Sequence, residues 1–94
     1  MSELLVENEL KQALKRIPEW EMVDKCIERT IEFDDFVGAI DFVDQVAEIA
    51  EEEDHHPDID IRYNKVTLSL STHHESGLTS RDFNVAERID NLVE

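Results

Sequence analysis

The sequence has little of several residue types, and each scarcity excludes a class of protein. Cys26 is the single cysteine, which excludes an internal disulfide framework and suits a reducing compartment. Glycine and proline number two each, and no repeat, low-complexity stretch or linker is present. No apolar run approaches the roughly 20 residues of a membrane span, and no secretory signal is expected at the N-terminus. We therefore expect a soluble, cytoplasmic protein without a membrane partner.

Positive charge is also scarce. Lys and Arg number 9 against 24 Asp and Glu, which gives a formal net charge of −15 at pH 7. Binding to nucleic acid depends on Lys and Arg that displace counterions from phosphates, so this excess of negative charge predicts no direct nucleic-acid contact. The one dense acidic run, over 51–54, is too short for a disordered tail. We interpret the acidity mainly as a solvated surface.

Length and hydrophobic content together fit one domain. The chain has 94 residues, of which 40 % are hydrophobic, and this is enough for one modest core. We therefore predict a single domain over residues 1–94. Apolar residues recur at helical spacing over 3–17, which predicts a helix with Ser2 as its N-cap and Pro18 as its end.

A first hairpin is expected directly after this helix. An extended stretch starts at Trp20, the chain turns near Asp24 and Lys25, and apolar and polar residues then alternate over 27–33. The odd positions are Ile, Arg, Ile and Phe, and the even ones are polar, which is typical of a strand with one buried face.

A long helix with an unusually wide apolar face follows the first hairpin. It is capped by Asp34 or Asp35 and runs to about Glu53. Steps of 100° place its apolar residues in one arc of about 180°, whereas packing on a sheet usually needs about 100°. The arc consists of Phe36, Ala39, Ile40, Phe42, Val43, Val46, Ala47, Ile49 and Ala50. Either the surplus lies in a deep groove of a monomer, or, as we favour, it meets another subunit.

The second hairpin is expected to turn at Asn64 and Lys65, because Asn tolerates the positive φ of a tight turn. In that register each apolar side chain meets an apolar partner, which supports it. The pairs are Tyr63 with Val66, Ile61 with Leu68, and Ile59 with Leu70.

The remaining segment completes the predicted fold. Gly77 marks a turn, and Thr79 or Ser80 caps a last amphipathic helix. The order is therefore α-β-β-α-β-β-α. We predict an α+β, two-layer sandwich whose four-stranded antiparallel sheet carries helices on one face.

All four histidines of the chain fall into two pairs, His55–His56 and His73–His74. Extended along the second hairpin, the expected register places His56 opposite His73 and His55 opposite His74, so the four rings should lie close together. Histidine titrates near neutral pH, which suits proton transfer to or from a substrate.

Three interpretations of this histidine cluster compete: a surface cluster without a role, a metal site, and a metal-free acid/base pocket. Histidine and carboxylate are adequate zinc ligands, but the adjacency of His55 and His56, without HxxxH or HxH spacing, argues against metal. We favour the metal-free acid/base pocket. Glu51, one helical turn before His55, either orients a ring or binds a ligand, or is one more solvated acid. We interpret Cys26, in a strand, as a structural thiol.

A longer pattern resembles a known family. The sequence contains E-x3-HHP over 51–57, YNKV over 63–66, STH over 71–73, GL over 77–78 and RD over 81–82. At these distances the set is a specific signature, and from about Trp20 to the last helix the chain resembles pterin-4a-carbinolamine dehydratase. The resemblance implies the same element order and dehydration of 4a-hydroxytetrahydrobiopterin, or a related 4a-hydroxytetrahydropterin, to the quinonoid dihydropterin plus water. It also implies a place in tetrahydrobiopterin recycling.

The resemblance implies roles for individual residues. The matched active-site histidines are His55, His56 and His73. The matched substrate-binding residues are Glu51, Arg81 and Asp82. The reaction needs an acid for the leaving 4a-hydroxyl and a base for the N5 proton, and neither step needs a redox cofactor or a metal. We expect His55 and His73 to transfer protons and His56 mainly to bind and orient the pterin.

Two positions depart from the family pattern. Ile59 stands where many members have an aromatic residue that could stack on the pterin, which leaves affinity and choice of substrate open, and His74 stands where many have an acid. The vertebrate member also binds a homeodomain transcription factor as a dimerisation cofactor. A protein-interaction module that uses the apolar central helix is therefore the alternative function. The apolar arc and the habit of the family predict a homodimer or homotetramer.

Overall fold

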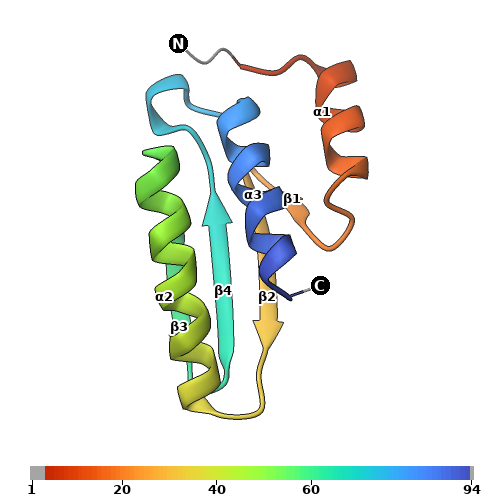
Figure 1. Cartoon of the computed structure of the whole chain (residues 1–94). Helices are drawn as coiled ribbons and strands as arrows, with labels where there is room; N and C mark the ends of the chain where they lie inside the picture. The colour runs from red at the N-terminus through yellow and green to blue at the C-terminus, as the bar shows by residue number, and fades with distance from the viewer. Residues whose placement is uncertain (1–3, 94) are drawn as a thin grey trace.

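The computed structural model describes residues 4–93 and has three α-helices and a four-stranded antiparallel sheet. In Figure 1, α2 and α3 lie in front of the sheet, and α1 lies to one side, beyond β1. The elements are α1 (Glu7–Lys15), β1 (Glu21–Val23), β2 (Cys26–Glu32), α2 (Phe36–Glu53), β3 (Asp58–Arg62), β4 (Lys65–Leu70), a one-turn 3-10 helix (His73–Glu75) and α3 (Ser80–Val93). The strand order is β1-β2-β4-β3. The predicted α+β sandwich, with the order α-β-β-α-β-β-α, is confirmed.

The core lies between the sheet and the helices. Alternation along β4 sends Val66, Leu68 and Leu70 into it, and all three are fully buried. From the other layer, α3 contributes Phe83 and Ile89, which are also fully buried. Within the described part of the chain, no helix is long and apolar enough to cross a membrane.

The first helix is shorter than predicted, because it begins at Glu7. The expected N-cap, Ser2, lies outside the described residues. Leu4 and Leu5 precede the helix, and the N–H of Leu5 donates to the carbonyl oxygen of Leu78 at 3.0 Å. The apolar spacing at these two positions therefore reflects packing against the segment before α3 and not a helical turn.

This N-terminal segment closes tightly on the loop that follows β4. A Cβ on Gly77 would lie 2.8 Å from Cδ2 of Leu4, which is closer than real Cβ atoms approach. Leu78, the next residue, is only 4 % exposed. Glycine at position 77 therefore leaves room for the end of the Leu4 side chain.

The central helix α2 has the predicted bounds, and Asp35 is its N-cap. The Asp35 side chain accepts a hydrogen bond from the N–H of Gly38 at 2.8 Å, and Asp54, with φ of 52°, ends the helix. Only part of the apolar arc is buried in the chain itself, namely Ala39, Phe42, Val46, Ile49 and Ala50. Phe36 is 48 % exposed and Val37 is 65 % exposed. The N-terminal end of α2 thus leaves an apolar surface uncovered.

The predicted register of the second hairpin is wrong by two residues. Ile59 pairs with Leu68, so the turn consists of Tyr63 and Asn64 instead of Asn64 and Lys65. A shift by two keeps every side chain on its face of the sheet, so matching apolar partners cannot distinguish the two registers.

Contacts with β2 determine where this hairpin turns. Nδ2 of Asn64 donates to the carbonyl oxygen of Phe33 at 2.8 Å, and the Asn64 carbonyl oxygen accepts from the N–H of Phe33 at 2.8 Å. Tyr63 takes the positive φ, 54°. Pairing with the end of β2 therefore outweighs the local preference for asparagine at the positive φ.

We predict that Asn64→Ala lowers the free energy of unfolding by about 1 kcal/mol, because a hydrogen bond to Phe33 is lost. Urea denaturation followed by circular dichroism measures this change. Asn84→Ala, at an exposed position of α3, is the matched control and should not destabilise the protein. Equal stability of Asn64→Ala and the wild type would contradict the role given to Asn64.

Candidate active site

A cavity of about 340 Å³ lies at the end of the molecule where α2 and β4 end and α3 begins (Figure 1). Its lining residues are Asp54, His55, His56, Ser71, Thr72, His73, His74 and Arg81. All four histidines of the chain therefore border one cavity.

The expected pairing of the histidines across the hairpin is wrong, although all four line one cavity. β3 begins at Asp58 and β4 ends at Leu70, so the ladder stops before either histidine pair. Thr72 instead forms an isolated bridge with Gly77, and the chain between them carries His73 in the 3-10 turn. The loop after β4, not the ladder, brings the two histidine pairs to the same cavity.

His55 is the buried histidine of the cavity. It is 9 % exposed, and its Nε2 lies 2.6 Å from Oδ1 of Asp82. Asp82 is fully buried and does not line the cavity, so it contacts the ring from behind. Because a carboxylate only accepts hydrogen bonds, Nε2 of His55 is the donor.

The other ring nitrogen of His55, Nδ1, is accessible. It makes no hydrogen bond within residues 4–93, where the ring's one partner is Asp82. No buried side-chain nitrogen or oxygen of these residues lacks a partner, so Nδ1 cannot be buried. Since His55 lines the cavity, Nδ1 is free to exchange a proton with a molecule bound there.

Asp82 lies in the first turn of α3 and has partners on both oxygens. Its Oδ2 accepts from the N–H of Thr79 at 2.9 Å and from the hydroxyl of Thr72 at 2.8 Å. Thr79, which directly precedes Ser80, is therefore the N-cap of α3, and this was one of the two predicted alternatives. The hydrogen bond from the Thr79 N–H to Asp82 completes a capping box. Together with His55, these donors compensate the buried negative charge.

His56 and Glu51 form an exposed pair beside the cavity. Nε2 of His56 lies 2.6 Å from Oε2 of Glu51, and the two side chains are 56 % and 78 % exposed. Glu51 thus contacts the ring of His56 and not that of His55. It does not itself line the cavity.

The acidic run at the end of α2 is more than the solvated surface expected from the sequence. Arg88 of α3 donates to Glu52 at 2.6 Å and to Glu53 at 2.9 Å, and these hydrogen bonds raise the pKa of Arg88. Arg81 donates Nη2 to the carbonyl oxygens of Asp54 at 2.7 Å and Glu53 at 3.3 Å. Two arginines of α3 therefore hold the C-terminal end of α2, where helix carbonyls lack partners.

His73 and His74 are exposed and lie in the 3-10 turn. In the described part of the chain, the hydrogen-bonded histidine rings are those of His55 and His56. The rings of His73 and His74 are therefore available to a ligand in the cavity. Among residues 4–93, no three His, Cys, Asp or Glu side chains are arranged to hold a metal ion.

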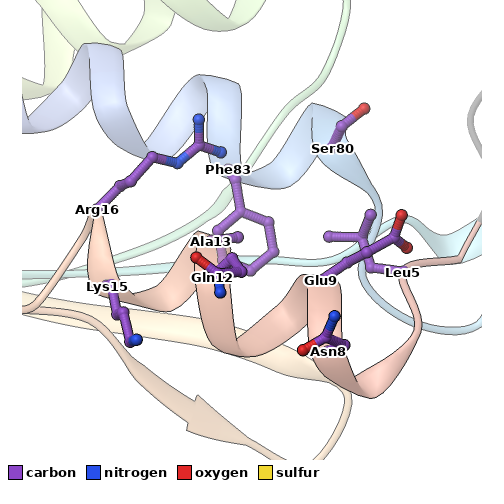
Figure 2. Close-up of a pocket in the computed structure, with 9 residues that line it drawn as sticks. All are labelled: Leu5, Asn8, Glu9, Gln12, Ala13, Lys15, Arg16, Ser80 and Phe83. Atoms are coloured by element: carbon purple, nitrogen blue, oxygen red, sulfur yellow. The ribbon is translucent and has the colours of Figure 1, made fainter.

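A larger cavity, of about 510 Å³, lies between α1 and α3 (Figure 2). Phe83 and Ala13 form its apolar floor, and the charged side chains of Lys15 and Arg16 lie at one end. It contains no histidine and no buried carboxylate. The smaller cavity with four histidines is therefore the better candidate for chemistry.

The cavity with the histidines is lined by four of the six residues matched to the family pattern, namely His55, His56, His73 and Arg81, and also by His74. Asp82 lies behind His55, and Glu51 lies outside, on His56. Sequence reasoning missed the hydroxyl of Thr72. The STH motif placed Thr72 beside His73, but only the folded chain brings it to Asp82.

Comparisons with known proteins agree with the sequence pattern. The family model described as pterin 4 alpha carbinolamine dehydratase matches residues 3–92. A provisionally named pterin-4-alpha-carbinolamine dehydratase of Picosynechococcus sp. is 48 % identical over 92 residues, which cover 98 % of this chain and 100 % of the relative. One of Acidobacterium capsulatum is 51 % identical over 84 residues, which cover 89 % and 91 %.

A solved structure is also similar over nearly the whole chain. It is described as a transcriptional coactivator/pterin dehydratase from Brucella melitensis, with a TM-score of 0.92 and 36 % sequence identity. The match covers 97 % of this chain and 99 % of that one. The chain belongs to the pterin-4-alpha-carbinolamine dehydratase family, a family of hydro-lyases.

Proposed function

We propose that the protein dehydrates a 4a-hydroxytetrahydropterin, such as 4a-hydroxytetrahydrobiopterin, to the quinonoid dihydropterin and water. The C4a–O bond breaks, and the hydroxyl group leaves as water after it accepts a proton. N5 loses its proton, and a C4a=N5 double bond forms. The step is neither an oxidation nor a reduction, so acid/base groups are sufficient. We place the reaction in tetrahydrobiopterin recycling in the cytoplasm, within one domain over residues 1–94.

The observation that carries this proposal is the buried contact between His55 and Asp82 at the wall of a cavity with three further histidines. A surface cluster without a role does not need a fully buried carboxylate behind one of its rings. Burial of that carboxylate is costly unless it is fully hydrogen-bonded, as it is here. One histidine in a fixed orientation, beside His73 and His74, whose rings have no hydrogen-bond partner within residues 4–93, is a suitable set for proton transfer.

His55 and His73 are the proposed proton carriers. Asp82 holds Nε2 of His55, so His55 exchanges its proton through Nδ1. His73 lies on the loop after β4 and faces the same cavity with an unengaged ring. One of the two protonates the leaving hydroxyl group and the other takes the N5 proton.

His56, Glu51 and Arg81 bind and orient the pterin in this proposal. Glu51 holds the ring of His56 at 2.6 Å. Arg81 lines the cavity, and its Nη2 is bound to the carbonyl oxygens at the end of α2, which fixes the guanidinium in place. His56 and Arg81 thereby present polar groups to the cavity in defined positions.

For Asp82 we propose a positioning role instead of the substrate contact expected from the sequence. Its side chain is fully buried, and its oxygens are occupied by His55, Thr72 and Thr79. A pterin in the cavity would meet the ring of His55 first. Ile59, the departure from the family pattern, is 39 % exposed and does not line the cavity of the single chain.

We predict that His73→Ala lowers kcat by about 10²–10⁴-fold, because a general acid or base usually contributes that much. His55→Ala should have a similar effect, and the assay uses freshly generated 4a-hydroxytetrahydropterin with the spontaneous rate subtracted. His56→Ala should act more through KM, since its role is binding. Glu51→Ala should be milder than either proton-carrier variant, because Glu51 does not move the reacting proton.

Far-ultraviolet circular dichroism has to show that each variant folds as the wild type does. A double variant His55→Ala, His73→Ala that dehydrates the substrate as fast as the wild type would refute the proposed function.

The second candidate function is a protein-interaction module. Its support is the uncovered end of α2, where Phe36 and Val37 are 48 % and 65 % exposed, and the word coactivator in the description of the Brucella protein. The same surface is where we propose that a homodimer or homotetramer forms. A pure interaction module would not need the hydrogen-bonded histidine site, so we rank it second.

We predict that Val37→Asp weakens self-association, because it places a charge in the proposed apolar interface. Val37 is a better choice than Phe42, which is 4 % exposed and supports the core. Val6→Asp, at a valine of similar exposure (62 %), is the matched control. Light scattering at micromolar concentration measures the mass. A wild-type monomer, or equal mass for both variants and the wild type, would contradict this assembly.

We also predict that dehydratase activity survives extensive chelation, because the proposed chemistry uses imidazole and no metal. Activity before and after dialysis against a chelator, together with elemental analysis, makes the measurement. One tightly bound metal per chain, with activity lost on its removal, would establish a metal site instead.

A further inference from the structure

Two threonines contact the second oxygen of Asp82, Thr72 through its hydroxyl group and Thr79 through its backbone N–H. Thr72 is 5 % exposed, and Thr79 is fully buried. Oγ1 of Thr72 lies 2.8 Å from Oδ2 of Asp82 and 2.8 Å from Oγ1 of Thr79. Oγ1 of Thr79 also accepts from the N–H of Arg81 at 3.3 Å. The first oxygen of Asp82 is the one that contacts His55.

The direction of each hydrogen bond follows from the number of hydrogens. A hydroxyl group has a single hydrogen, and a carboxylate has none. Thr72 must therefore use its hydrogen toward Asp82, and it must accept from Thr79. The bonds then run in one direction, from the N–H of Arg81 through Thr79 and Thr72 to Asp82. Hydrogen bonds aligned in this way polarise and strengthen one another.

This chain of donors determines how Asp82 meets His55. Oδ2 is occupied by the hydroxyl of Thr72 and the N–H of Thr79, so the carboxylate is held in one orientation with Oδ1 on Nε2. A neutral imidazole carries one N–H. If Nε2 carries it, Nδ1 is the unprotonated nitrogen that can accept a proton in the cavity.

We propose that Thr72 is a positioning residue: its hydroxyl group, oriented by Thr79, locks Asp82 so that His55 is kept in the Nε2–H tautomer. The kinetic consequence rests on the proposed dehydratase function. The tautomer of His55 does not depend on that function and can be measured separately.

Thr72 also fixes the loop that carries His73. Its N–H donates to the carbonyl oxygen of Gly77 at 2.8 Å, and its carbonyl oxygen accepts from the N–H of Glu75 at 3.0 Å. His73 is the next residue in the chain. One residue thereby connects the two proposed proton carriers, His55 through Asp82 and His73 through the backbone.

The test is Thr72→Val, which removes the hydroxyl group and nearly preserves the shape of the side chain. We expect kcat to fall about tenfold with little change in KM, because one hydrogen bond to a charged group is lost. Nitrogen-15 NMR of the imidazole should show a smaller fraction of the Nε2–H tautomer at His55. Thr72→Ser keeps the hydroxyl group and should restore both the rate and the tautomer.

The chain offers a matched control on the open face of the sheet. Oγ1 of Thr67 lies 2.8 Å from Oγ1 of Thr30, the same distance as in the buried pair. Thr67→Val therefore removes a threonine–threonine hydrogen bond outside the site. It should change neither kcat nor the tautomer of His55.

A folded Thr72→Val protein with the wild-type kcat and the wild-type tautomer would overturn the proposal. If Thr72→Val does not fold, the exchange of the Thr72 hydroxyl proton with water, measured by NMR in the wild type, tests the proposal instead. Protection from exchange supports the proposal, and rapid exchange overturns it. If the wild type does not dehydrate a 4a-hydroxytetrahydropterin, the proposed function fails, while the tautomer measurement still tests the role of Thr72.

Discussion

Asp82 carries a negative charge into the interior, and hydrogen bonds to both of its oxygens compensate that charge. His55 binds one oxygen, and Thr72 and Thr79 bind the other. These partners come from the end of α2, the end of β4 and the start of α3, so a single carboxylate connects the three segments that form the cavity. Without these donors a buried charge is strongly destabilising. The local fold and the arrangement of the site therefore depend on the same contacts.

Most of the fold could be predicted from the sequence because it follows from local patterns. The alternation of apolar and polar residues predicted strands, and the two acids at 34 and 35 predicted the start of α2, where Asp35 is the N-cap. The predicted start of α1 and the predicted turn of the second hairpin were wrong for the same reason. At Leu5 and at Asn64 the backbone pairs with a distant segment, Leu78 and Phe33 respectively. Residue spacing carries no information about such partners.

The candidate site, too, could be predicted from the sequence only in part. The histidines do line one cavity, as expected, although the hairpin register from which that was predicted is wrong and the ladder does not extend that far. The contact of His55 with Asp82 spans 27 positions and exists only because α3 packs against the end of α2. Whether a carboxylate faces the substrate or supports a ring from behind depends on its burial, which the motif does not specify.

The close approach of Leu4 to Gly77 links the N-terminal segment to the histidine loop. A side chain at position 77 would displace the end of the Leu4 side chain. In evolution, residue size at positions 4 and 77 should therefore change in a correlated way. In the laboratory, an affinity tag is better attached after α3, whose end lies far from this loop in Figure 1, than ahead of the segment that covers it.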